Sequence, residues 1–177
     1  HIITIGCQMN KSDSERVASY LEQNNCTEIS EAREADIVVL NTCGVRQSAE
    51  DRIYGLIPSI KKENPECRLI LTGCLNYRDD VRERVKEQVD LFLFITELPY
   101  LFQKLGVETS EEEPEAEKNE YLRIPPKWSS EFRAYIQLGN GCNNFCSYCV
   151  VPYARGREVY RPAEEVIKEV EEVVNKG

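Results

Sequence analysis

The sequence predicts an α/β fold, an open parallel sheet with flanking helices, and two observations carry this prediction. Short, uniformly apolar runs recur through the first hundred residues, and amphipathic charged stretches separate them. A strand that is apolar on both faces is typical of a buried parallel sheet, and helices that alternate with such strands cover the sheet. The chain has 177 residues, which is enough to bury such a core.

The expected elements of this first domain, residues 1–105, follow one another as strand and helix. Ile2–Ile5 is the first strand. Ser12 and Glu15 have the spacing of a capping box, which predicts a helix from there to Gln23. Further strands are expected at residues 36–40, 68–71 and 91–95, and further helices at residues 46–62, 79–88 and 98–105.

Residues 106–130 are expected to link this domain to a second one. Seven acidic residues and a single lysine lie between residues 106 and 120 without periodicity, which indicates a solvated acidic linker. Pro125 and Pro126 favour an extended lead-in segment after it.

Residues 131–177 predict the first strand–loop–helix unit of a second domain. The alternation of residues 132–138 is typical of a strand, a cysteine-rich loop follows, and residues 162–176 form an amphipathic helix. One such unit cannot close a core, so we expect a truncated domain here.

Composition excludes several classes of protein. No apolar run approaches the ~18 residues of a membrane span, so a soluble, cytoplasmic protein is expected. The net charge of −9 argues against a nucleic-acid footprint over the whole surface, although residues 121–177 hold eight basic and seven acidic side chains. The single histidine, His1, excludes histidine acid–base catalysis and most zinc–histidine sites. The eight cysteines are therefore the candidates for chemistry.

Three of these cysteines follow predicted strands. Cys7, Cys43 and Cys74 lie 36 and 31 residues apart, each just past a strand. The carboxyl ends of parallel strands share one edge, where open α/β domains bind ligands. Three thiolates without histidine suit an iron–sulfur cluster with one iron left open. Three unrelated buried cysteines are the alternative.

Three further cysteines form a Cys-x3-Cys-x2-Cys loop: Cys142, Cys146 and Cys149. Such a loop can wrap a cluster and leave its fourth iron open to an external ligand. Zinc is the main alternative, although a zinc knuckle normally shows a fourth ligand. Cys26 and Cys67 fit neither pattern and are expected to be small buried residues.

The cysteine loop, with an aromatic residue before its last cysteine, resembles the signature of radical S-adenosylmethionine enzymes. Joined to the upstream three-cysteine domain, it is similar to the methylthiotransferases. Gln8-Met9-Asn10 and Val151-Pro152-Tyr153 resemble the branch that modifies isopentenyl-adenosine beside the tRNA anticodon. Sister branches act on a ribosomal-protein aspartate or on threonylcarbamoyl-adenosine in tRNA. Asn140 and Tyr160 depart from the glutamate and serine common in the family. The matching stretches are residues 6–10, 41–43, 72–74, 149–153 and 155–158.

The resemblance implies two 4Fe–4S clusters. Cys142, Cys146 and Cys149 would hold the cluster that binds S-adenosylmethionine and generates a radical able to remove hydrogen from adenine C2. Tyr148 would pack near the adenine of S-adenosylmethionine. The auxiliary cluster on the other three cysteines would carry the sulfur that a second S-adenosylmethionine methylates.

The implied partners are tRNA and an electron donor such as a flavodoxin or ferredoxin, and the expected state is a monomer. Arg155 and Arg157 are either tRNA phosphate contacts or solvated loop residues. Asn10 and Asn41 either order the open face of the auxiliary site or serve as plain turn and cap residues. The rival function is a cluster- or zinc-binding module without catalysis. A flavodoxin-like flavin site is disfavoured because no Ser/Thr-rich loop follows the first strand.

Overall fold

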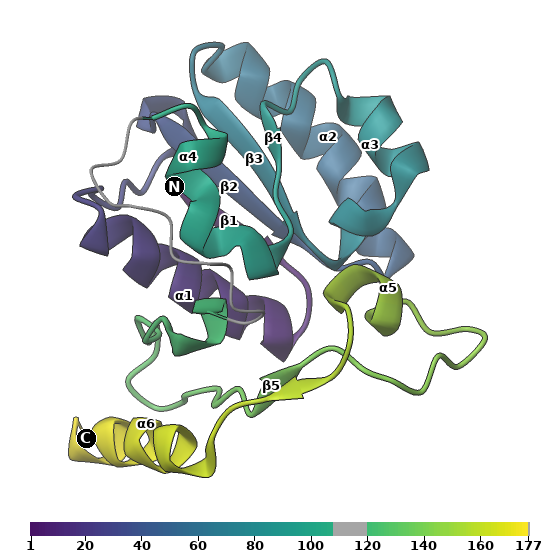
Figure 1. Ribbon diagram of the computed structural model, residues 1–177. Helices are drawn as coiled ribbons and strands as arrows, with labels where there is room; N and C mark the ends of the chain where they lie inside the picture. The colour runs from purple at the N-terminus through teal and green to yellow at the C-terminus, as the bar shows by residue number, and fades with distance from the viewer. Residues whose placement is uncertain (108–119, 177) are drawn as a thin grey trace.

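Four parallel strands, paired in chain order, form the sheet of the computed structural model, which describes residues 1–107 and 120–176 (Figure 1). Apart from its first residue, each of the two central strands is buried throughout, as uniformly apolar runs predict. The strands are β1 (Ile2–Ile5), β2 (Ile37–Thr42), β3 (Arg68–Gly73) and β4 (Leu91–Phe92). The predicted α/β architecture is confirmed.

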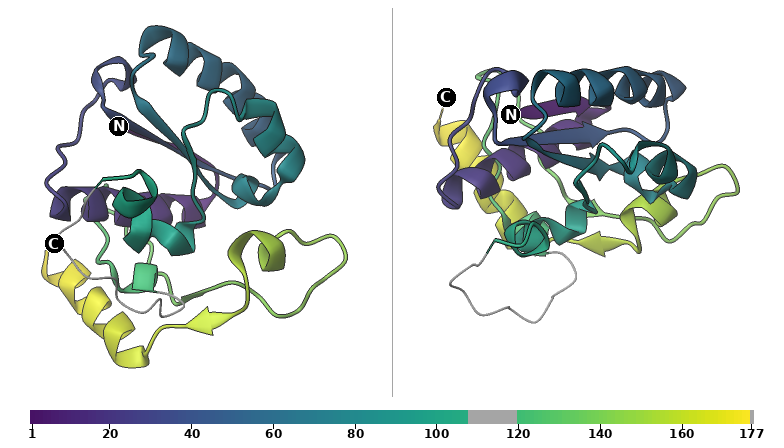
Figure 2. Two further views of the ribbon diagram at one scale, coloured as in Figure 1. Left: turned by 45° about the horizontal axis from the view of Figure 1, so that its top comes forward. Right: turned by 90° about the horizontal axis from the view of Figure 1, so that it is seen from above.

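Helices cover both faces of the sheet (Figure 2). On one face, α2 (Gln47–Glu63) and α3 (Asp79–Val85) pack against side chains such as Leu40 and Leu71. On the other face, α1 (Gln8–Gln23), the 3-10 helix η3 (Ile95–Tyr100) and α4 (Leu101–Lys104) pack against Val39 and Ile70. Successive residues of one strand thus enter two different cores, which is why the strands lack polar alternation.

Two predicted boundaries in this domain are wrong. The first helix begins at Gln8, four residues before the predicted capping box, because the Asn10 side chain accepts a hydrogen bond from the Cys7 N–H at 3.1 Å and secures an earlier start. The fourth strand has two residues instead of five. It is cut short because the Glu97 carboxylate accepts the Phe94 N–H at 3.0 Å and starts η3 there.

The second part of the chain runs beneath the sheet domain (Figure 1). The strand predicted at residues 132–138 is wrong: apart from the Leu138 carbonyl at its end, which accepts from the Arg161 N–H at 2.9 Å, the segment pairs with no strand of the described residues and forms no ladder. The two residues that follow it, Gly139 and Asn140, pair in antiparallel direction with Tyr160 and Val159. The elements are η4 (Glu120–Arg123), β5 (Gly139–Asn140), α5 (Val151–Arg155), β6 (Val159–Tyr160) and α6 (Ala163–Asn175).

The start of this second part is anchored in the core of the first. The segment predicted to be extended begins instead as a 3-10 turn, and its Tyr121 and Leu122 are buried with the α1 face of the sheet. Most of the predicted acidic linker, residues 108–119, lies outside the described residues. The division at residues 105 and 130 stays a prediction.

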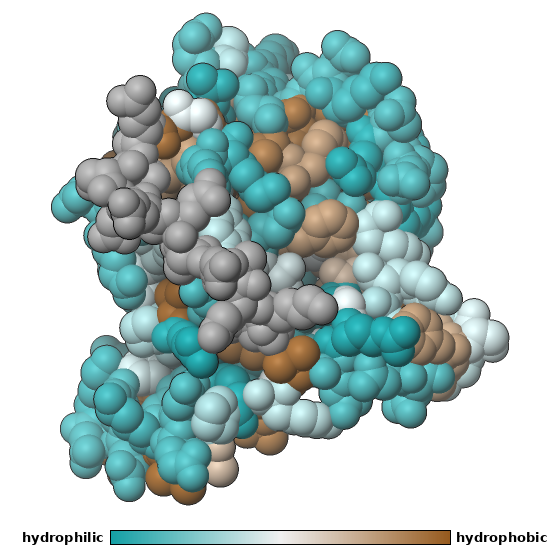
Figure 3. All heavy atoms as spheres, in the orientation of Figure 1, coloured by the Kyte–Doolittle hydropathy of each residue, from teal (hydrophilic) through white to brown (hydrophobic). Residues whose placement is uncertain are grey.

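The last helix, α6, is amphipathic as expected, but it turns a charged residue inward. Glu169 is buried, whereas Ile167, Val170 and Val174 are exposed. Figure 3 shows hydrophobic surface along the lower edge of this helix. In the part of the chain that is described, no helix combines the length and apolar character needed to cross a membrane.

Candidate metal centre

The first three candidate cysteines lie at the carboxyl ends of adjacent strands. In the strand register, Ile5 pairs with Thr42 and Thr42 with Gly73, so the strands end level. Cys43 and Cys74 follow at once and are buried, and Cys7 follows one residue later and is half-buried. The backbones touch here, because a Cβ built on Gly44 would lie 2.6 Å from the Cys74 carbonyl oxygen.

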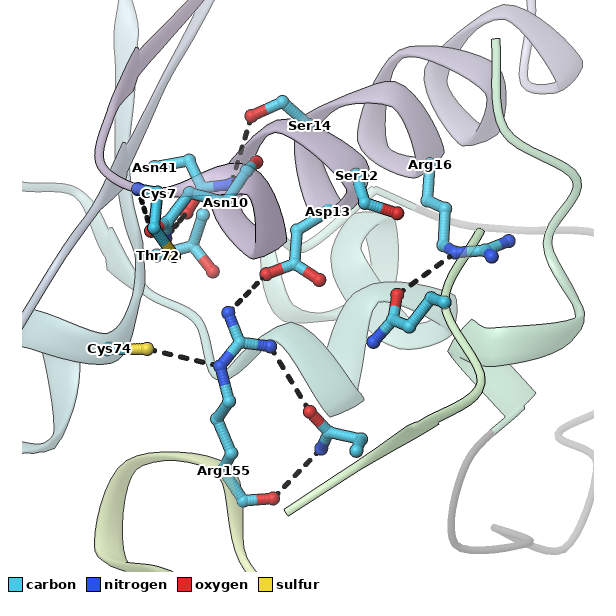
Figure 4. Close-up of polar contacts among 12 residues, drawn as sticks. Cys7, Asn10, Ser12, Asp13, Ser14, Arg16, Asn41, Thr72, Cys74 and Arg155 are labelled. Atoms are coloured by element: carbon cyan, nitrogen blue, oxygen red, sulfur yellow. Dashed lines mark hydrogen bonds and ion pairs between the residues drawn. The ribbon is translucent and has the colours of Figure 1, made fainter. Parts of the chain in front are cut away.

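A buried amide pair holds the turn that carries Cys7 (Figure 4). The Asn10 Nδ2 donates to Asn41 Oδ1 at 2.9 Å and to the Thr42 carbonyl at 3.1 Å. The Asn41 Nδ2 donates back to the Asn10 carbonyl at 2.8 Å and to Ser14 Oγ at 2.9 Å. The Cys7 thiol itself lies 3.4 Å from Asn10 Oδ1. Both asparagines are thus more than turn residues: together they fix the β1–α1 connection to the end of β2.

Arg155 contacts this centre from the other part of the chain. Its Nε donates to Cys74 Sγ at 3.1 Å, and its two terminal nitrogens donate to Asp13 Oδ2 at 2.5 Å and Asn140 Oδ1 at 3.1 Å (Figure 4). Only 7% of Arg155 is exposed. Both expectations for this residue, a tRNA phosphate contact or a solvated loop arginine, are therefore wrong. Arg157 is exposed, with its guanidinium 4.8 Å from the Phe145 ring centre.

Asp13 is the site residue that sequence reasoning missed. It stands inside the predicted capping box, where an acidic residue is ordinary and draws no notice. In the structure this carboxylate is completely buried and faces Arg155. The signal that could have found it is its place three residues after Asn10, on the side of the helix that meets the strand ends.

Burial and charge act in opposite directions on these groups. Burial raises the pKa of the Cys74 thiol, and the Arg155 guanidinium opposes that rise. Burial likewise disfavours the charged form of Arg155, but the Asp13 carboxylate and Cys74 outweigh it and raise the pKa of Arg155. The guanidinium therefore stays protonated and favours an ionised sulfur beside it.

Several buried polar atoms near this edge lack partners. Within the described residues, Asp13 Oδ1, Thr72 Oγ1 and both amide atoms of Asn76 make no hydrogen bond. Buried polar groups are nearly always paired in folded proteins. Three thiols, with unpaired hydroxyl and amide donors on the adjoining residues, form a donor set suited to an iron–sulfur cluster. Even so, no three Cys, His, Asp or Glu side chains of residues 1–107 and 120–176 stand close enough together to share one metal ion.

The second cysteine group lies on the loop between β5 and α5. Cys142 and Cys149 are half-buried and Cys146 is exposed. Both ends are fixed: the Cys142 N–H donates to the Gly156 carbonyl at 3.2 Å, and the Cys149 N–H to the Cys146 carbonyl at 2.9 Å. The three thiols are not gathered into one group of metal donors, so their role stays a prediction.

The remaining candidates differ in how exposed they are and in what they contact. Tyr148 is 90% exposed, and its contact with S-adenosylmethionine stays a prediction. Cys67 is buried as expected, whereas Cys26 is half-buried. Of the two departures from the family pattern, Asn140 holds Arg155 and Tyr160 is exposed.

The fold and the cysteine pattern have counterparts among known families. Residues 1–94 match the model described as "Uncharacterized protein family UPF0004", and residues 136–177 match the Radical SAM superfamily. The chain belongs to the first of these families, and the second match covers the cysteine loop.

Curated relatives carry a more specific name. Proteins from Syntrophomonas wolfei and Dictyoglomus thermophilum are each 40% identical to this chain, over 99% and 100% of its length. One from Moorella thermoacetica is 37% identical over 99%. All three are named tRNA-2-methylthio-N(6)-dimethylallyladenosine synthase. The chain spans about 42% of the length of each of these relatives.

Proposed function

We propose that this chain is the cluster-binding part of a tRNA methylthiotransferase that adds a methylthio group to C2 of N6-isopentenyl-adenosine beside the anticodon. The observation that carries the proposal is that Cys7, Cys43 and Cys74 follow the carboxyl ends of adjacent strands at one sheet edge, where Arg155, from the segment that bears the other cysteines, donates to Cys74. The names of the relatives support the same reaction.

The proposed roles follow the two cysteine groups. Cys7, Cys43 and Cys74 hold the auxiliary 4Fe–4S cluster, and the loop cysteines hold the second, with Tyr148 beside S-adenosylmethionine. When bound, the clusters and S-adenosylmethionine supply the one-electron chemistry that activates an aromatic C–H bond, which no side chain here can do. The loop cysteines are Cys142, Cys146 and Cys149.

The protein's own contribution is to shape and charge the auxiliary site. Asn10 and Asn41 fix the turn that presents Cys7, and Arg155 places a buried positive charge at Cys74. We further propose that the protein acts as a cytoplasmic monomer, with tRNA as substrate and a flavodoxin or ferredoxin as electron donor.

Iron counting tests the two-cluster proposal. After anaerobic reconstitution with iron and sulfide, we expect about eight iron atoms per chain, from two cubane clusters. The Cys7→Ala/Cys43→Ala/Cys74→Ala and Cys142→Ala/Cys146→Ala/Cys149→Ala variants should each keep about four. Zinc in place of iron, or iron lost from only one of the two variants, would contradict two independent clusters and favour the structural module.

A chimaera tests the substrate. Residues 1–177 would replace the matching part of the Syntrophomonas wolfei relative, since this chain covers 42% of that protein. We expect the purified chimaera to add a methylthio group, detected by nucleoside mass spectrometry, to tRNA that contains isopentenyl-adenosine. Modification of tRNA that contains threonylcarbamoyl-adenosine, or of the ribosomal protein, would instead assign the chain to a sister branch.

A further inference from the structure

Arg155 belongs to one cysteine-bearing segment and contacts the sulfur of the other. It ends α5, six residues after Cys149, and α5 packs on the 3-10 helix η2 (Cys74–Tyr77). The rings of Tyr77 and Tyr153 stack across this junction at 6.5 Å. The loop that carries the second cysteine group is therefore joined to the first centre through Arg155 and its helix.

We infer that Arg155 is a positioning residue of the auxiliary centre: its Nε–H hydrogen bond orients the Cys74 sulfur and raises the reduction potential of the cluster held there. This inference rests on the proposed function, because it requires a cluster on Cys7, Cys43 and Cys74.

The geometry leaves the guanidinium one orientation. Asp13 and Asn140 accept from its two terminal nitrogens, and the Asn140 amide also donates to the Arg155 carbonyl at 2.9 Å. With both terminal nitrogens held, the Nε–H must point at Cys74 Sγ. A lysine ammonium is a single point charge and cannot make these three contacts at fixed angles.

The direction of the effect follows from the charge that a cluster gains on reduction. Hydrogen bonds to cluster sulfurs and nearby charges set its potential, and a donor stabilises the more negative, reduced state. The Asp13 carboxylate accepts from a neighbouring terminal nitrogen and offsets part of the Arg155 charge, but the Nε–H itself points at Cys74 Sγ and donates to it. Arg155 is 4% exposed on its side chain, and water therefore screens this contact little.

The test measures a potential, which a purely structural role would not move. The Cys142→Ala/Cys146→Ala/Cys149→Ala chain is reconstituted so that only the auxiliary cluster contributes, and its reduction is followed by electron paramagnetic resonance during a redox titration. In this background we expect Arg155→Gln to lower the potential, and Arg155→Lys to lower it less because the charge remains. The matched control is Arg157→Gln, which removes the same charge from an exposed position two residues away and should leave the potential at its starting value.

The outcomes are distinguishable by the iron count. If the background chain holds no cluster before Arg155 is changed, the proposed function fails and takes this inference with it. If both Arg155 variants hold four irons at the starting potential, the inference alone is overturned. If Arg155→Gln loads no iron, the reduction potential of Arg155→Lys decides: a lowered potential supports the inference and an unchanged one overturns it. The Asp13→Asn/Arg155→Gln variant, in which neither side chain carries a charge, gives a second measurement of the potential. Loss of iron from all three variants, with native circular dichroism and a loaded Arg157→Gln control, supports a guanidinium that builds the centre.

Discussion

Asp13→Asn should undock the second part of the chain from the sheet domain. The Asp13 side chain is 0% exposed and its Arg155 partner 4%, so the substitution leaves a buried guanidinium without its counter-charge. Breaking a buried pair in this way costs about 3–5 kcal/mol of unfolding free energy. Asp80→Asn is the control, because that carboxylate also pairs with an arginine, Arg78, but is 67% exposed. We expect Asp80→Asn to lower the free energy of unfolding by much less than Asp13→Asn does.

The assay is urea unfolding of the iron-free chain, followed by two probes. Trp128 is the single tryptophan, and Lys176 of the last helix lies 4.3 Å from its ring centre, so its fluorescence reports the second part of the chain. Far-ultraviolet circular dichroism reports mainly the sheet domain. For Asp13→Asn, the fluorescence transition should move to lower urea by the shift that a loss of about 3–5 kcal/mol of unfolding free energy predicts.

A double-mutant cycle separates the pair from its surroundings. Asp13→Asn/Arg155→Gln replaces both charges by amides, and exchanging a whole buried pair is far less costly than removing one partner. The double variant should therefore be more stable than Asp13→Asn alone. A loss below about 1 kcal/mol for Asp13→Asn, or two single losses that simply add, would refute this account of the pair.

Three further predictions concern the sheet domain. Gly73→Ala should destabilise it strongly, because Gly73 has φ +90° and a Cβ there would lie 2.3 Å from the Thr42 carbonyl oxygen; thermal unfolding would show this, and an unchanged melting temperature would contradict it. Leu71→Ala, at a fully buried position, should lower the unfolding free energy by about 2–5 kcal/mol in urea titrations, and a loss under about 1 kcal/mol would mean that the site is not packed. Burial alone would raise the pKa of Asp90, but hydrogen bonds led by that from Lys61 hold it below its ordinary 3.8, so the stability it contributes is present above pH 3.8 and disappears as the pH falls through its lowered pKa. Asp90→Asn should therefore be less stable than the parent at pH 7 and equal to it at the acid end of a urea-midpoint series, whereas a difference that grows toward acid would reverse the sign.

The three longer strands of the first domain were predictable because burial alone governs their sequence. Leu69 and Leu71 face one core and Ile70 the other, and no competing signal obscures that pattern. The start of α1 was not predictable in the same way. Ser12 and Glu15 have capping-box spacing, but the Asn10 side chain secures the turn four residues earlier, and only the fold brings Asn41 to support it.

Some features of the site were likewise predictable from the sequence, and others were not. The closeness of Cys43 and Cys74 could be predicted from the sequence. Each follows a strand directly, and parallel strands in register end side by side at the same edge of the sheet. The Arg155 contact could not, because 81 residues separate it from Cys74 and no local pattern marks a buried arginine. Residues 132–138 show the converse: their alternation is that of a strand, but a strand exists only beside a partner, and the described residues place none there.

Helix α1 fixes the spacing of the contacts that join the two parts of the chain. Asn10 reaches the strand ends, Asp13 reaches Arg155, and Arg16 donates to Gln137 Oε1 at 3.3 Å. At 1.5 Å and 100° per residue, these three attachments span about 9 Å of axis and an arc of about 120°. One residue inserted after Asn10 would swing the latter two by about 100°, away from their partners. The length of this stretch of helix is thus as constrained as its sequence.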